Sequence, residues 1–184
     1  DIAFGGAYLY AATDRGIYRA DVNGPNLVDY NAWEKLEFLP GTGSFSFLAW
    51  FDGRLFTIYR NPSSGFDNII SVNGNSWELW SGSWDDYYGY LGDQGENLVI
   101  CGTQRTKVFA PPATLIREVS SYYAKHGLLD KKGGLCYADP ERGLIRIPES
   151  GEEKVICPDG PAFRSAGDME ARAGKLWVGG GTES

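Results

Sequence analysis

The sequence is poor in the side chains that carry metal and nucleophilic chemistry. It has one histidine, His126, and three cysteines, with no Cys-x-x-Cys pair. The odd number and the spacing of the cysteines argue against a zinc site, and no spaced aspartate series matches a calcium loop. A Ser-His or Cys-His catalytic pair would have to use His126, which stands in Ala-Lys-His-Gly, a context typical of a turn. No Gly-x-Ser-x-Gly motif is present. We therefore expect no metal, no cofactor and no enzymatic activity.

The cysteines themselves suit packing. Cys101 and Cys136 stand in apolar, strand-like runs, where a thiol behaves as a small hydrophobic side chain, so both are expected in the core. Cys157 precedes Pro158-Asp159-Gly160, a turn signal, and is expected to be more exposed.

Basic residues and long apolar runs are also scarce. Lysine and arginine total 17 against 24 acidic residues, which gives a formal net charge of -7 and a sequence pI of about 4.7. Nucleic acid is not expected as a partner, because its recognition needs clustered positive charge and Lys131-Lys132 is the only adjacent basic pair. No apolar run approaches the roughly 20 residues that span a bilayer. The chain opens at Asp1, without a methionine, on strand-like Ile-Ala-Phe, and we expect a mature or excised fragment.

Aromatic residues, glycine and turn signals are abundant instead. Aromatics make up 14% of the chain, with 25 glycines and 9 prolines, whereas helix signals are few. The stretch from Tyr8 to Asp21 shows the pattern, since two short runs of strand-forming residues flank Thr13-Asp-Arg-Gly16 and predict a β-hairpin. This composition indicates an all-β protein with short strands.

A leucine that closely follows a glycine recurs along the chain. The copies carry Leu9, Leu55, Leu98, Leu135 and Leu176, at intervals of 46, 43, 37 and 41 residues. A period near 40 to 45 with about four strands per unit is typical of propeller blades. We predict an all-β fold, a β-propeller fragment of four-stranded antiparallel blades, with about four and a half blades in this chain.

The repeats divide the chain into approximate blades. These are 1–40, 41–84, 85–120, 121–160 and a partial blade at 161–184, within a single, incomplete propeller domain spanning 1–184. Further blades are expected outside this segment, because a ring cut between two strands leaves unpaired edges. The alternative is a five-bladed ring that residues 1–4 close by joining the last blade. In the first blade we expect the outermost strand at 33–38, and in the second a tight turn at 73–76.

Several of these repeats resemble a known family. The segment 9–21 looks like the two-component regulator propeller repeat, 176–180 is similar to its first half, and 138–146 is a looser copy. The segment 102–109 departs from it by placing Thr106 where the repeat has glycine. In Bacteroidetes, such propellers form sensor halves of hybrid two-component systems and the body of PorZ-type surface proteins of the type IX secretion machinery. The segment 16–33 looks most like the PorZ-type proteins.

The resemblance implies a function. It points to a non-catalytic, extracytoplasmic propeller in the periplasm or at the cell surface, serving as a protein-interaction scaffold in type IX secretion and cell-surface attachment. Its partner would be a protein or a surface glycan. The first alternative is the ligand-sensing ectodomain of a hybrid two-component system. The second is a carbohydrate-binding or carbohydrate-processing propeller, although the sequence singles out no carboxylate pair of the kind that glycosidases use.

The densest aromatic stretch, 77–90, is the candidate binding site. Aromatic faces beside carboxylates suit sugars, and aromatics also anchor protein interfaces. Alternation along the strands places Trp77, Tyr88 and Tyr90 in the core. The link between two blades is then expected to expose four residues, namely Trp80, Trp84, Asp85 and Asp86. The alternative for Trp84 is a ring wedged between blades as part of the core.

Overall fold

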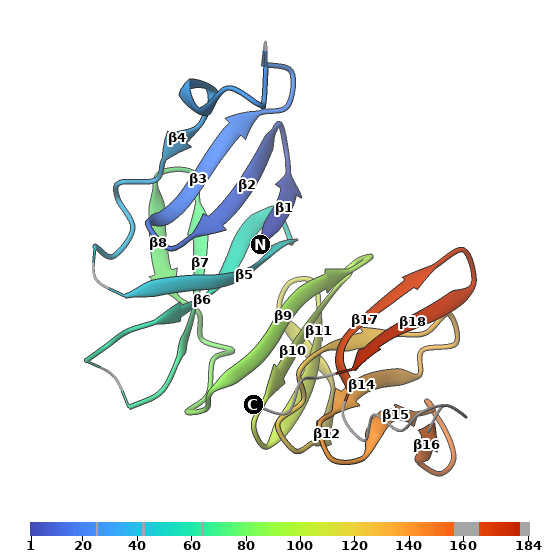
Figure 1. Ribbon diagram of the computed structural model, residues 1–184. Helices are drawn as coiled ribbons and strands as arrows, with labels where there is room; N and C mark the ends of the chain where they lie inside the picture. Colours follow the sequence, from blue (N-terminus) through green and yellow to red (C-terminus); the bar gives the residue numbers. More distant parts are fainter. Residues whose placement is uncertain (25, 42, 64, 157–165, 181–184) are drawn as a thin grey trace. The chain divides into compact units, whose positions relative to one another are not determined.

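The chain is an all-β protein, as the sequence predicts. The computed structural model describes residues 1–24, 26–41, 43–63, 65–156 and 166–180. These residues form strands β1 to β18 and one short 3-10 turn, η1 (Tyr30–Ala32), with no α-helix among them (Figure 1). The strands make four antiparallel four-stranded sheets and one two-stranded sheet. The division of the chain into blades with the boundaries given above stays a prediction.

The first sheet has the order β1 (Ile2–Gly5), β2 (Tyr8–Thr13), β3 (Gly16–Asp21) and β4 (Glu34–Lys35). The predicted hairpin is confirmed, because Thr13 pairs with Gly16 across a two-residue turn. The Thr13 hydroxyl stabilises this turn by accepting the Arg15 N–H at 3.1 Å and donating to the Gly16 carbonyl at 2.9 Å.

The outermost strand of this sheet is shorter than the expected 33–38. Trp33 is held by η1 instead, because its N–H donates to the Tyr30 carbonyl and its indole Nε1 donates to the Leu27 carbonyl at 2.9 Å. After Lys35 only Leu36 continues the pairing, through its N–H to the Ile17 carbonyl, and the chain then turns. The prediction placed a strand here correctly but gave it the wrong length.

The second sheet has the order β5 (Ser44–Phe51), β6 (Arg54–Arg60), β7 (Asn68–Asn73) and β8 (Ser76–Leu79). Asn73 pairs with Ser76 across a two-residue turn in which Gly74 has a φ of 58°, so the predicted tight turn is confirmed. A bulge interrupts β5 between Ser46 and Leu48, with Phe47 as the extra residue at a φ of 58°. The Asp1 carboxylate accepts the Leu48 N–H at 2.7 Å beside this bulge.

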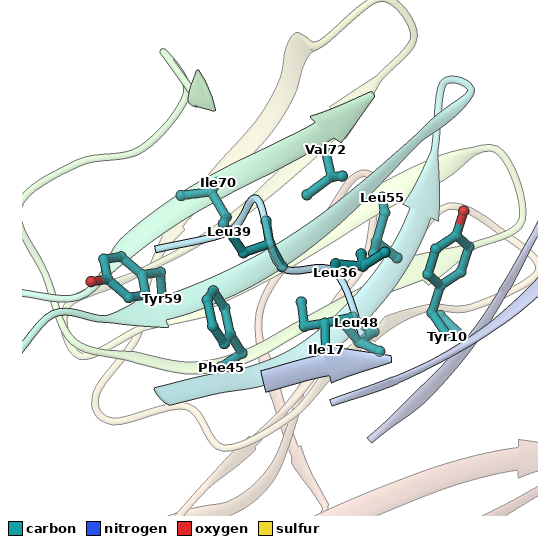
Figure 2. Close-up of a cluster of buried hydrophobic side chains, with 11 residues drawn as sticks. Tyr10, Ile17, Leu36, Leu39, Phe45, Leu48, Leu55, Tyr59, Ile70 and Val72 are labelled. Atoms are coloured by element: carbon teal, nitrogen blue, oxygen red, sulfur yellow. The ribbon is translucent and has the colours of Figure 1, made fainter. Parts of the chain in front are cut away.

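The chain divides into two compact units. The first comprises residues 1–87 together with 91–98 and 110–114. Inside it, the first and second sheets share one apolar core, in which side chains from both sheets meet (Figure 2). Ile17 of β3 and Ile70 of β7 are fully buried there. Burying such a side chain contributes about 1.5–3 kcal/mol, so this core is the main force holding the two sheets together. The buried members are Ala3, Tyr10, Ile17, Leu36, Leu39, Phe45, Leu48, Leu55, Tyr59, Ile70 and Val72.

The remaining sheets follow the same pattern of short antiparallel strands. The third contains β9 (Tyr88–Gln94), β10 (Asn97–Gly102), β11 (Arg105–Ala110) and β12 (Thr114–Ser120), with β9 and β12 at its edges. The fourth contains β13 (Gly127–Leu129), β14 (Leu135–Asp139), β15 (Gly143–Ile147) and β16 (Lys154–Ile156). The two-stranded sheet contains β17 (Ala166–Arg172) and β18 (Lys175–Gly180). In the second unit, Met169 of β17 packs with a buried cluster from the fourth sheet, namely Leu128, Cys136, Ala138 and Leu144.

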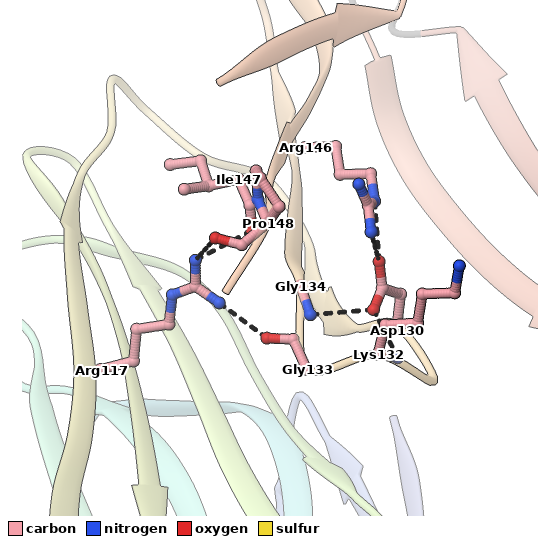
Figure 3. A network of polar contacts seen from close by, with 8 residues as sticks. All are labelled: Arg117, Asp130, Lys132, Gly133, Gly134, Arg146, Ile147 and Pro148. Atoms are coloured by element: carbon pink, nitrogen blue, oxygen red, sulfur yellow. Dashed lines mark hydrogen bonds and ion pairs between the residues drawn. The ribbon is translucent and has the colours of Figure 1, made fainter. Parts of the chain in front are cut away.

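A polar network in the second unit joins β12 to the fourth sheet (Figure 3). The Arg117 guanidinium donates to three backbone carbonyls, those of Gly133 (2.7 Å), Ile147 (2.9 Å) and Pro148 (2.7 Å). Beside it, the Asp130 carboxylate accepts from Arg146 Nε at 2.7 Å and from the N–H groups of two residues of its own turn, Lys132 and Gly134. Partial burial raises the pKa of Asp130, but these hydrogen bonds outweigh it and hold the pKa below its ordinary value.

Candidate binding surface

The link segment, residues 80–87, leads from β8 toward β9 and contains all four predicted site residues. Trp80 begins it and is core, with 7% of its surface exposed. Its ring meets Phe56 edge to face at 5.3 Å and lies on Gly82, where an added Cβ would stand 2.5 Å from the ring. The expectation that Trp80 is exposed is therefore wrong. Although β8 ends at Leu79, the Trp80 side chain that follows still packs against Phe56 of the sheet.

Asp86 is also buried rather than exposed, with 4% of its surface accessible. Its carboxylate accepts the Trp84 indole N–H at 2.9 Å and the Tyr87 N–H at 2.8 Å. Its carbonyl accepts the Asp67 N–H at 3.1 Å, so the link segment is bridged to the loop between β6 and β7. The expected exposure of Asp86 is wrong, because its carboxylate positions the segment around it.

The loop side of this bridge has its own support. The Asp67 carboxylate, also buried, accepts from the Arg60 guanidinium at 3.1 Å. A charged hydrogen bond of this kind fixes Asp67, and with it the backbone bridge to Asp86. The support beneath the surface therefore includes the Arg60–Asp67 pair and the backbone bridge from Asp67 to Asp86, all within the first unit.

Four residues remain for a partner, and we call them the link surface: Phe66, Trp84, Asp85 and Tyr87. Asp85 is exposed and Trp84 is half-buried. The Phe66 and Tyr87 rings are 43% and 53% exposed and lie 5.6 Å apart, tilted by 57°. Exposed aromatic rings on a bridged backbone form a preorganised apolar surface, and Asp85 adds a carboxylate acceptor beside it.

The sequence interpretation missed Phe66 and Tyr87. Tyr87 is the last residue before β9, which begins at Tyr88. Phe66 lies in the turn region between the second and third strands of its sheet. In a four-stranded antiparallel sheet, the turn between the second and third strands lies at the same end of the strands as the exit from the fourth strand. Topology alone therefore predicts that Phe66 lies near the link segment.

The core predictions for the same stretch hold in part. Tyr88 and Tyr90 are buried, as expected, with 2% and 8% of their surfaces exposed. Trp77 is 39% exposed, which contradicts the expectation, because β8 is the outermost of the strands described for this sheet. A cavity of about 140 Å³ lies beside it and is lined by polar residues. Two of these, Arg54 and Glu78, form an ion pair at 2.6 Å.

The reactive side chains of the second unit serve packing. Cys101 and Cys136 are buried as expected, and burial raises the pKa of Cys101 to about 12. Burial also raises the pKa of Tyr137 to about 12. The His126 ring lies 3.9 Å from that of Tyr90, and the His126 carbonyl accepts the Ala138 N–H, so this residue extends the fourth sheet rather than forming a turn. Cys157 lies outside the described residues.

Within the described ranges, no group of three or more His, Cys, Asp or Glu side chains is placed to hold a metal ion. The described part of the chain likewise contains no helix with the length and apolar character of a membrane span.

Comparison with known proteins finds similar structures but no matching sequence family. No family model matches the sequence, and no curated protein matches it. Among solved structures, the chain is similar to PorZ, an essential bacterial surface component of the type IX secretion system of Porphyromonas gingivalis. The TM-score is 0.63 at 16% identity, over 98% of this chain and 24% of PorZ. It is also similar to a luciferin-regenerating enzyme, with a TM-score of 0.58 at 12% identity, over 97% of this chain and 67% of the enzyme.

Likeness at such low identity concerns the backbone alone. The chain spans about a quarter of the length of PorZ, so what PorZ does as a whole protein does not transfer with its fold. The four-stranded antiparallel sheets and these structural neighbours together show a β-propeller fold.

Proposed function

We propose that the chain is a non-catalytic, extracytoplasmic propeller that serves as a protein-interaction scaffold, PorZ-like, in type IX secretion and cell-surface attachment. The observation that carries the proposal is the link surface, where Phe66 and Tyr87 expose touching rings above a buried polar support. Rigid aromatic side chains supply contact area at little entropic cost, which is why they dominate interaction hot spots.

The titration behaviour of the chain supports a non-catalytic role. Among the described residues, burial within strands raises the pKa of both Cys101 and Tyr137 to about 12. A general acid or base works best with a pKa near the operating pH, whereas burial moves the pKa values of these two groups further above neutral pH. The pKa of Asp130 is lowered, because hydrogen bonds from Arg146, Gly134 and Lys132 outweigh the opposing effect of burial.

The biological setting is part of the proposal. The backbone likeness to PorZ covers nearly the whole chain, and the segments 9–21 and 16–33 carry the sequence resemblance described above. Both support a place among extracytoplasmic propellers of Bacteroidetes. The sensor ectodomain of a hybrid two-component system is the rival, and a transmembrane segment followed by a histidine kinase in the same reading frame would favour it.

The test is a binding measurement with a matched control. The immobilised chain is exposed to purified proteins of the type IX attachment machinery, and the variants Tyr87→Ala and Tyr30→Ala are compared. Tyr30 is 81% exposed and lies outside the link surface. We expect Tyr87→Ala to weaken binding by about 2 kcal/mol or more, as at an interface hot spot, and Tyr30→Ala to leave it unchanged. Equal binding by wild type and Tyr87→Ala would overturn the assignment of the surface.

A glycan is the second candidate ligand for the same surface. The specific observation in its favour is Asp85, whose exposed carboxylate can accept hydrogen bonds from sugar hydroxyls beside the aromatic rings. A glycan array in which binding by the wild type is lost with both Tyr87→Ala and Asp85→Asn would assign the surface to carbohydrate. Turnover of a carbohydrate substrate that one carboxylate substitution abolishes would contradict the non-catalytic proposal altogether.

A further inference from the structure

The link surface has a definite order of exposed and buried side chains. In the link segment, Asp85 and Tyr87 are exposed on either side of buried Asp86. In the loop that is bridged to it, Phe66 is exposed next to buried Asp67. Side chains at alternate positions of an extended chain share one side, so the carboxylate of Asp85 and the ring of Tyr87 lie on the same exposed side. All of these residues belong to the first unit.

The backbone bridge sets how the two segments face each other. Asp67 pairs with Asp86 in an antiparallel sense. The neighbouring residues Phe66 and Tyr87 therefore stand opposite each other, and their rings are in contact. Asp85 lies two positions before Tyr87, which is roughly 7 Å along an extended chain. This spacing places the Asp85 carboxylate at the edge of the aromatic pair.

The polar groups of this surface are mainly hydrogen-bond acceptors. Asp85 supplies a carboxylate, which accepts through both oxygens. The Asn68 amide donates its Nδ2 to the Phe66 carbonyl at 3.3 Å, and this orientation turns its Oδ1 acceptor away from the bond. The Trp84 indole N–H is already donated to Asp86. A ligand that suits this surface is therefore rich in donors.

The charges at this surface favour a cation. Asp67, Asp85 and Asp86 place three carboxylates in the two bridged segments, and the Arg60 guanidinium pairs with Asp67. The whole chain has a formal net charge of -7. A negative surface on a negative chain attracts positively charged partners and speeds their association.

Among the cationic side chains of proteins, arginine matches this surface best. Its guanidinium is planar and carries five N–H donors with no acceptor. It stacks on aromatic faces, and such a contact is favourable within about 6 Å of the ring centroid. A guanidinium that lies on the Tyr87 ring can therefore direct its N–H groups to the Asp85 carboxylate. A lysine ammonium can make the charged contact but has no plane to stack on the ring.

We propose that the link surface binds an arginine side chain from an exposed segment of the protein partner. The guanidinium lies on the Tyr87 ring and donates to the Asp85 carboxylate. The inference rests on the function proposed above, because it names the chemistry that the partner presents to the same surface.

Titration of the 184-residue chain with a short peptide tests the inference. The probe is an acetylated and amidated Gly-Ser-Arg-Ser-Gly peptide, compared with peptides that carry citrulline or lysine in place of the arginine. Citrulline keeps the shape of arginine but removes its charge. Backbone amide NMR shifts report the Kd and the place of binding. The variants are Asp85→Asn, Tyr87→Ala and, as the matched control, Asp14→Asn, an exposed aspartate outside the link surface. Unchanged melting temperatures establish that each variant is folded.

We expect the arginine peptide to shift the amides of residues 84–87 and to bind at least about fivefold more tightly than the citrulline peptide. Asp85→Asn and Tyr87→Ala should each weaken its binding at least about threefold, and Asp14→Asn should leave it unchanged. Added NaCl should weaken it as well. Equal binding of the arginine and citrulline peptides, tighter binding of the lysine peptide, or shifts confined to other residues would overturn the inference.

The inference and the proposed function fail on different results. A protein partner whose binding is lost with Tyr87→Ala but is unchanged with Asp85→Asn would overturn the arginine inference and leave the link surface as the binding site. Equal binding of that partner by the wild type and Tyr87→Ala would overturn the proposed function. The peptide titration decides arginine recognition without any partner present.

Discussion

Trp80 and Tyr87 stand at the two ends of one link segment and are both aromatic, yet their surroundings give them opposite roles. Trp80 packs on Phe56 and Gly82, whereas Tyr87 is half exposed and touches Phe66. We expect Trp80→Ala to lower the free energy of unfolding by about 3–5 kcal/mol. Tyr87→Ala should change it by less than about 0.5 kcal/mol. Urea unfolding of both variants measures the difference, and similar losses in the two would contradict these roles.

Gly82 offers a second test at a single residue. An added methyl group would stand 2.5 Å from the buried Trp80 ring, so Gly82→Ala must displace the ring or the backbone and should destabilise by about 1–3 kcal/mol. Gly65 lies in the loop before Phe66, and an added Cβ there meets nothing within 4 Å. Gly65→Ala is therefore the matched control and should leave the melting temperature unchanged. A neutral Gly82→Ala would mean that the Trp80 packing is loose.

At this scale the sequence predicted residue types better than residue environments. It singled out the link segment, where aromatics and carboxylates are dense in the sequence, but it predicted Trp80 and Asp86 to be exposed and Trp77 to be buried, and the structure shows the opposite. Alternation fixes which side of a strand a residue takes, whereas exposure depends on what lies on that side. The partner of Asp86 is an indole N–H two residues away, and the partner of Tyr87 is a ring 21 positions earlier in the sequence; neither is visible in a local pattern.

Among the elements, β12 is linked to the fourth sheet by the Arg117 side chain. The planar Arg117 guanidinium donates hydrogen bonds to three carbonyls at once. A lysine ammonium on its flexible side chain does not reproduce this geometry. Arg117→Lys should therefore lower stability by about 2 kcal/mol, the scale of charged hydrogen bonds to partly buried acceptors. The control on the neighbouring strand is Arg105→Lys, since Arg105 makes an exposed ion pair with Glu118 and should contribute less than about 1 kcal/mol. Equal effects in thermal unfolding would argue against the special role of Arg117.

The turn after β13 gives a pH-dependent prediction. The folded pKa of Asp130 lies below its ordinary value of 3.8, so its ionised form stabilises the fold at neutral pH. This stabilisation is present above the ordinary value and is lost as pH falls through the lower folded pKa. The stability difference between wild type and Asp130→Asn should therefore be constant near neutral pH and shrink below 3.8. Urea unfolding at a series of pH values measures it, and a difference that persists in strong acid would refute the assignment.

The elements themselves were largely predictable. The glycine-to-leucine repeat predicted the second strand of each sheet, and turn residues such as Asn73-Gly74 predicted the hairpins. Strand ends were harder to predict, as β4 shows, because Trp33 donates its backbone N–H to Tyr30 in the 3-10 turn and its indole N–H to the Leu27 carbonyl, six residues earlier. Local propensity predicts that a strand exists, while competing hydrogen bonds decide where it begins and ends.

For the whole molecule, repetition implies that stability is distributed sheet by sheet. Each sheet of a repeat protein gains its stability from its own pairing and from the sheets it packs against. The first and second sheets share one extensive core, so an opening of one exposes the buried face of the other. We expect the central strands of these two sheets to lose hydrogen-exchange protection together, as a single cooperative unit.

The two-stranded sheet β17–β18 should behave differently. Two paired strands alone are marginally stable in water, and among the side chains described for this sheet Met169 is buried against the fourth sheet. We expect its amides to exchange at a lower opening free energy than those of β10, where five of the six residues are buried and pairing occurs on both sides. Met169→Ala should speed exchange in β17–β18 while leaving β10 unchanged, because it removes packing from one sheet only. Native-state hydrogen exchange followed by mass spectrometry resolves the two segments. Equal protection of β10 and β17–β18 in the wild type would mean that the chain opens only as a whole, against the sheet-by-sheet organisation that its repeats imply.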